Sequence, residues 1–98
     1  KQISYDMFKQ GLSVEEIATN RGLVVSTILG HLISYVETGE IPANKLISDD
    51  KIKLISDFIS NNVFEGIGEI KQALGNRVEY GDIRVVIAHL KYKSNGKT

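Results

Sequence analysis

The side chains of this 98-residue chain that could do chemistry are few, and most stand where a helix uses them structurally. The only histidines, His31 and His89, lie far apart in a chain without cysteine, so no zinc-ligand spacing occurs. The carboxylate pairs Glu15–Glu16 and Asp49–Asp50 each follow a serine, and acids there favour the positive end of a helix. We therefore expect no catalytic residue and no metal site.

The C-terminal triplet Gly96–Thr98 mimics the end of a phosphate-binding loop. Such a loop needs a glycine five residues before Gly96, where this chain has Lys91, and it needs a strand before it and a helix after it. Neither element is predicted. We therefore expect no nucleotide site, no cofactor and no small-molecule substrate in this chain.

Length and composition indicate one ordinary globular domain, residues 1–98, with a single modest core. No apolar run is long enough to span a bilayer, and the N-terminus lacks the apolar stretch of a signal peptide. With no cysteine present, these features predict a cytoplasmic protein that does not enter a membrane. The chain begins at Lys1 rather than at methionine, which favours a fragment of a longer protein.

The apolar spacing predicts an all-α, compact domain of about six helices, similar to a winged helix without a clear wing. Gly11, Gly22, Gly39 and Gly75 each follow a helical run, where a helix C-terminus favours glycine. The helices are expected at residues 5–10, 14–21, 25–38, 48–62, 67–74 and 81–93, with a frayed tail at 94–98.

Residues 12–38 have the pattern of a helix-turn-helix. Ser13 and Glu16 form a capping box, Gly22 supplies the turn, and an amphipathic helix follows. Leu23 and Val25 are expected to fill the wedge between the two helices. Residues 66–93 form a second, similar helix–turn–helix unit with a longer linker.

A helix-turn-helix that docks on DNA reads base edges with the first exposed residues of its second helix, here Ser26, Thr27 and His31. No Lys or Arg occurs between Arg21 and Lys45, so the phosphate contacts must come from elsewhere. The basic residues concentrate in 71–98, although the formal net charge is zero. The candidates are Arg77, Arg84, Lys91 and Lys93. Gly30, in mid-helix, indicates either a close approach by a phosphate or partner, or crowding between helices.

Several stretches spread over nearly the whole chain follow a pattern known from one protein family. They are Gly11–Ala18, Arg21–Ile28, His31–Leu32, Tyr35–Ile41, Ala73–Gly75, Tyr80–Arg84 and Ala88–Leu90. In these stretches the chain resembles the helix-turn-helix domain at the extreme C-terminus of some bacterial RecQ-family DNA helicases. One residue departs from the family pattern: Val24 stands where a serine commonly caps the second helix, and valine cannot cap.

The resemblance implies a non-catalytic accessory domain of an ATP-dependent 3′–5′ helicase that acts in DNA repair and recombination. The motor, with its ATP and magnesium, would lie upstream, and this domain would bind DNA weakly or contact the rest of the helicase. One alternative is a protein-interaction module on the same scaffold that binds no DNA. Another is a stand-alone transcriptional regulator, which would require a dimer.

Overall fold

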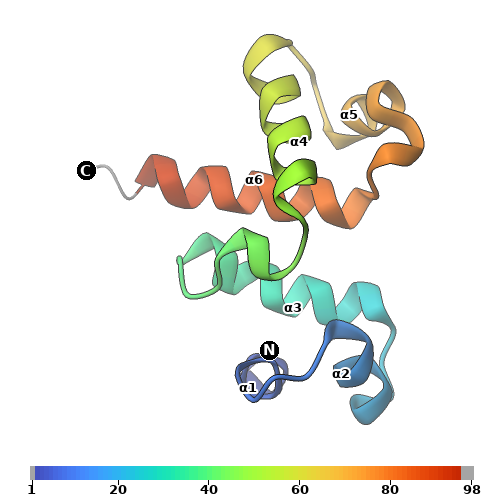
Figure 1. Ribbon diagram of the computed structural model, residues 1–98, viewed down its shortest axis with the longest axis vertical. Helices are drawn as coiled ribbons and strands as arrows, with labels where there is room; N and C mark the ends of the chain where they lie inside the picture. The colour runs from blue at the N-terminus through green and yellow to red at the C-terminus, as the bar shows by residue number, and fades with distance from the viewer. Residues whose placement is uncertain (1, 96–98) are drawn as a thin grey trace.

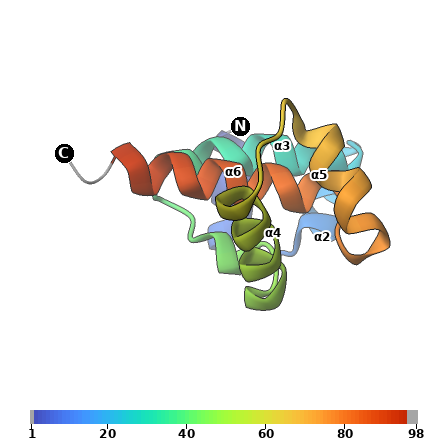
Figure 2. The same ribbon diagram turned by 90° about the horizontal axis from the view of Figure 1, so that it is seen from above.

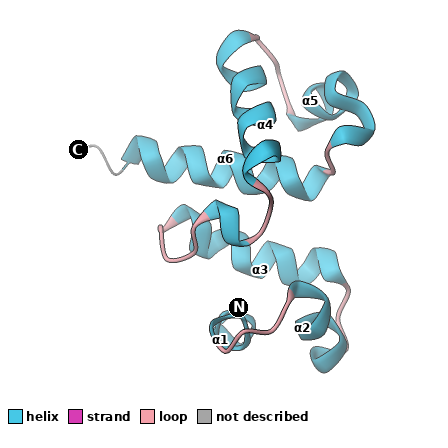
Figure 3. Ribbon diagram, in the orientation of Figure 1, coloured by secondary structure: helices cyan, strands magenta, loops and turns pink. Residues whose placement is uncertain are grey.

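The computed structural model describes residues 2–95, and that part of the chain consists of helices joined by loops and turns, with no strand (Figures 1 and 3). The all-α prediction is confirmed. Six α-helices and two short 3₁₀ helices follow one another: α1 (Gln2–Lys9), α2 (Val14–Arg21), α3 (Val25–Glu37), η1 (Ala43–Lys45), α4 (Asp49–Asn61), α5 (Ile67–Leu74), η2 (Gly75–Arg77) and α6 (Tyr80–Asn95).

Helices α3 and α6 lie side by side at the centre, with α1 and α2 on the far side of α3 and with α4 and α5 on the far side of α6 (Figures 1 and 2). The two central helices run in the same direction. Near their starts, a β-carbon on Gly81 would lie 2.5 Å from the Leu29 side chain. Near their ends, Lys91 Nζ lies 3.8 Å from a Glu37 carboxylate oxygen.

The buried apolar residues form two adjacent clusters on two sides of α6, which differs from the single core expected from length. The first cluster joins α1, α2, α3 and η1 to Val85 and Ala88 of α6. The second joins α4 and α5 to Ile83 and Val86 of α6. Because α6 is buried on both sides, Val85 and Ala88 are core residues that a one-sided amphipathic pattern does not predict.

Local capping rules explain where α2 and α4 begin. Ser13 Oγ accepts a hydrogen bond from the Glu16 N–H (3.1 Å), and the Glu16 carboxylate accepts one from the Ser13 N–H (2.8 Å), so the predicted capping box is confirmed. Ser48 caps α4 on one side only, since its Oγ accepts a hydrogen bond from the Lys51 N–H at 3.3 Å. Gly22 ends α2 at φ 65° and ψ 32°, a left-handed conformation that favours glycine, and this is the predicted turn.

The wedge prediction at the turn is wrong. Leu23 and Val25 are 38% and 42% exposed, so neither is a core residue between α2 and α3. Buried Ile17, Ala18 and Ile28 belong to that core instead. The chain leaves Gly22 with Leu23 and Val24 at the outside of the turn, which exposes three consecutive large apolar side chains at one corner of the molecule.

Two helix ends differ from the predictions by two residues or more. Helix α1 begins three residues earlier than expected, at Gln2, and its Ser4 is buried. Helix α6 continues to Asn95, so Ser94 is helical rather than frayed. The triplet Gly96–Thr98, which mimics a phosphate loop, lies outside the described residues.

Adding the missing cap should stabilise the domain. Val24 precedes α3 at φ −80° and ψ 155°, close to the geometry of the capping Ser13, and its side chain makes no capping hydrogen bond. Because Val24 is 64% exposed, Val24→Ser loses little apolar burial, and we expect a gain of about 1 kcal/mol. Thermal unfolding should show a rise in Tm of about 4–8 °C.

The matched control is Val63→Ser, because Val63 is fully exposed and lies outside any helix cap. This variant should leave the Tm within about 1 °C of the parent chain. Equal Tm values for Val24→Ser and the parent chain would contradict the capping assignment.

The stability of the domain should fall as the pH drops through about 6.5, because burial lowers the pKa of His89 and the nearby charge of Lys93 lowers it further. The unfolded chain then takes up a proton at His89 before the folded chain does. Denaturation of the parent and of His89→Gln at pH 7.5 and pH 5.5 checks this. The parent should lose more stability than the variant, and equal losses would contradict it.

Candidate nucleic-acid interface

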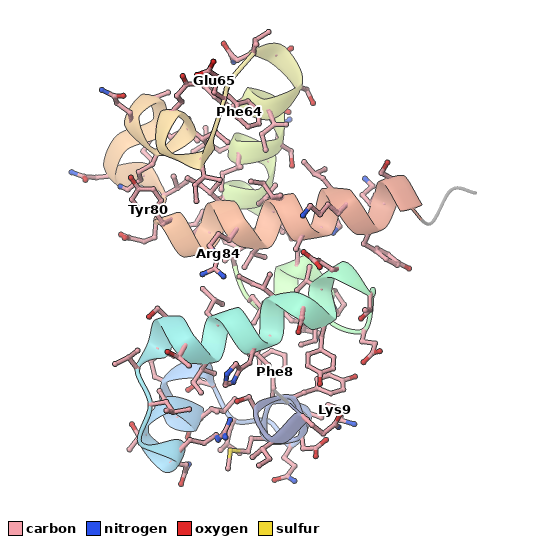
Figure 4. The ribbon with its side chains drawn as sticks, turned by 180° about the vertical axis from the view of Figure 1, so that it is seen from behind. Phe8, Lys9, Phe64, Glu65, Tyr80 and Arg84 are labelled. Atoms are coloured by element: carbon pink, nitrogen blue, oxygen red, sulfur yellow. The ribbon has the colours of Figure 1, made fainter. Side chains whose placement is uncertain are left out.

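The solvent-facing side of α3 carries small polar residues. Ser26 and Thr27 are exposed in its first turn, and Gly30 and Ser34 follow at helical spacing along the same side. Figure 4 shows the molecule from behind, with α6 above α3 and α1 below it. We refer to Ser26, Thr27, Gly30 and Ser34 as the open face of α3. Its side chains can donate and accept hydrogen bonds, but it carries no charge.

Arg84 brings a positive charge to the open face. In Figure 4 its side chain extends from α6 toward α3. A β-carbon placed on Gly30 would lie 3.7 Å from Nη2 of Arg84, so the guanidinium lies beside the glycine. Lys91, two turns farther along α6, lies on the same side of that helix and pairs with Glu37 of α3 at 3.8 Å. The structure therefore brings two of the four predicted basic residues to the border between α3 and α6.

The other two basic candidates lie elsewhere. Lys93 follows Arg84 by nine residues, which places it on the opposite side of α6, next to His89. Arg77 is exposed in η2, where its Nε donates to the Leu74 carbonyl oxygen at 3.2 Å and so closes the end of α5. The four residues thus do not form one continuous basic surface. The nine-residue spacing of Arg84 and Lys93 indicates that these two lie on opposite sides of α6. The sequence does not indicate where η2, which carries Arg77, lies relative to α3.

The half-buried His31 contacts α1. Its Nδ1 lies 3.0 Å from Oγ of Ser4, which is fully buried in α1, and Arg21 of α2 donates to the same oxygen at 2.9 Å. Since that oxygen already accepts from Arg21, its own proton is free to point at His31 Nδ1. This network joins α1, α2 and α3. Sequence reasoning missed Ser4, because the partner of His31 lies 27 residues away.

Gly30 has room for a side chain. Among the described residues, and apart from the adjoining backbone of α3, the Arg84 guanidinium is the only group within 4 Å of a β-carbon at this position, and 3.7 Å is an ordinary van der Waals distance. Helix crowding, one of the two explanations considered for this glycine, therefore does not account for it. A glycine inside a helix costs about 1 kcal/mol relative to alanine, so the domain carries a small instability that its own packing does not require.

Candidate chemistry elsewhere is limited. Among residues 2–95, no three acidic or histidine side chains converge as metal ligands. No helix in the described part of the chain combines the length and apolar character needed to cross a membrane. Ser13, Glu16 and Ser48 are engaged as helix caps. The open face of α3, with Arg84 beside it, is therefore the strongest candidate site.

The capped α2, the glycine turn and the exposed start of α3 define a helix-turn-helix fold, a type common among DNA-binding proteins. Residues 1–87 match the model of a family described as a helix-turn-helix domain, and the chain belongs to this family. No curated protein and no solved structure matches the chain.

Replacing the glycine should stabilise the domain. Because a β-carbon fits beside Arg84, Gly30→Ala gains helix propensity without a clash, and we expect about 1 kcal/mol of added stability. Urea denaturation measures this change. Loss of stability in Gly30→Ala would mean that packing between α3 and α6 does require a glycine.

Proposed function

We propose that this domain contacts DNA with the open face of α3, and that Arg84 and Lys91 of α6 supply the phosphate contacts. The observation that carries the proposal is the position of the Arg84 guanidinium beside Gly30. It places a cation beside a recognition helix that has no Lys or Arg of its own, next to the residues that would face a groove.

Gly30 supports the same surface. A glycine that packing does not require, on an exposed helix face beside an arginine, lets a phosphate backbone approach the helix closely. Ser26 and Thr27, one turn earlier, can hydrogen-bond to several bases and so discriminate little among sequences. The surface favours backbone contact over base reading.

Binding should be weak and sensitive to salt. The chain has no formal net charge, and few Lys or Arg side chains reach the open face, so only a few phosphates can be neutralised. Such a domain serves best as an accessory to a stronger DNA-binding unit in the same protein. The stronger unit then holds this domain close to the DNA, and the high effective concentration compensates for the domain's low intrinsic affinity for DNA.

We further propose that the domain is a non-catalytic accessory part of a RecQ-like, ATP-dependent 3′–5′ DNA helicase that acts in repair and recombination in the bacterial cytoplasm. Support for this parent comes from the resemblance of the sequence blocks near both ends of the chain. ATP and magnesium would belong to the motor. The coding sequence upstream of Lys1 tests the parent, and helicase motifs absent from it would overturn this part of the proposal.

Neutralising the two basic residues should weaken DNA binding. We expect Arg84→Gln/Lys91→Gln to reduce affinity about tenfold at low salt, and to lower the slope of log affinity against log salt by about 1–2, because two phosphate contacts are lost. Fluorescence anisotropy with forked, single-stranded and duplex DNA measures both quantities.

The matched control is Lys53→Gln/Lys93→Gln, which removes the same charge from α4 and from the opposite side of α6. This control should bind with nearly the affinity of the parent. Equal weakening in both double variants would mean that the loss of DNA affinity reflects net charge alone. It would overturn the assignment of Arg84 and Lys91 to the DNA-contacting surface. No binding of the parent to any of the three DNAs would overturn DNA contact altogether.

A further inference from the structure

A second surface lies at the start of α3, and it is apolar with an acidic border, whereas the open face is polar with a basic border. A groove of about 420 Å³ lies between the first turns of α2, α3 and α6 and the segment that precedes α4. The first turns of α3 and α6 lie at the same end of the molecule (Figure 1). Five apolar side chains line the groove: Val14, Val25, Leu29, Leu46 and Ile47.

The charged residues that line this groove are all acidic: Glu15, Glu79 and Asp82. Asp82 is internally satisfied, because its carboxylate accepts from the Glu79 N–H at 2.8 Å and pairs with Lys51 at 3.1 Å. Glu15 and Glu79 are exposed, and within the described part of the chain their carboxylates have no hydrogen-bond or ion-pair partner. Two unpaired carboxylates, those of Glu15 and Glu79, therefore lie beside the apolar side chains that line the groove.

Two exposed apolar residues are sequence neighbours of residues that line the groove. Val24 is 64% exposed and directly precedes the lining residue Val25, which is itself 42% exposed. Tyr80 is 51% exposed and lies between the lining residues Glu79 and Gly81. Adjacent exposed apolar side chains mark protein contact sites more often than isolated ones do.

We propose that this groove binds a short cationic amphipathic segment of a partner protein. Large apolar side chains of that segment would lie on Val25, Leu29 and Ile47, and its Lys or Arg side chains would pair with Glu15 and Glu79. A groove of this size accepts a few side chains, as in the binding of amphipathic helices. Of the four open-face residues, Ser26 alone also lines the groove, so the two surfaces meet at that residue. The acidic border repels phosphates, and the binding of a cationic segment does not depend on DNA contact.

The test uses two synthetic helical peptides with the same leucine face, one with lysines on its polar face and one with glutamates. Binding to the ¹⁵N-labelled chain is followed by NMR. We expect the lysine peptide to shift the backbone amides of Val25, Ile47 and Gly81, and the glutamate peptide to shift none of them. No binding of the lysine peptide, shifts confined to other residues, or equal binding of both peptides would overturn the proposal.

Removing the two free charges should weaken the lysine peptide about tenfold in Glu15→Gln/Glu79→Gln. The matched control is Glu40→Gln/Glu65→Gln, which removes two exposed carboxylates away from the groove and should bind as the parent does. Unchanged peptide affinity in Glu15→Gln/Glu79→Gln would overturn the charge pairing. The same variant should bind DNA at least as tightly as the parent, so failure here is distinguishable from failure of the DNA proposal.

Discussion

The parallel packing of α3 on α6 is the contact on which the rest of the structure depends. Leu29 against Gly81 sets the close approach at one end, and Glu37 pairs with Lys91 nearer the other. Because α6 is buried on two sides, it joins the two hydrophobic clusters that α1–α3 and α4–α5 form separately. Without this contact, Arg84 would not lie beside Gly30, and the groove between the two first turns would not exist.

The same packing gives the two sides of α3 different electrostatic character. On one side lies the open face, with Arg84 and Lys91 along its border. Adjoining it at Ser26 lies an apolar groove with free carboxylates at Glu15 and Glu79. A polyanion and a cationic peptide would therefore select neighbouring faces of one helix, which allows a small domain with no net charge to serve two kinds of partner.

Features that depend on a few neighbouring residues followed directly from the sequence. The capping box of Ser13 and Glu16, the left-handed turn at Gly22 and the uncapped start of α3 at Val24 all match the structure. Each depends on hydrogen bonds or backbone angles within about four residues, so the chain needs no distant partner to specify it. The α-helical class follows for the same reason, because apolar spacing is a local pattern.

Only the tertiary structure decided which side of each helix meets which neighbour. Ser4 is buried because α2 and α3 bring Arg21 and His31 to it, and Val25 is exposed because the turn carries it outward. Arg84 and Lys93 share one helix, yet they face different surroundings because α3 packs on one side of α6. Such placements depend on contacts between residues far apart in the chain, whose relative orientation no local rule specifies.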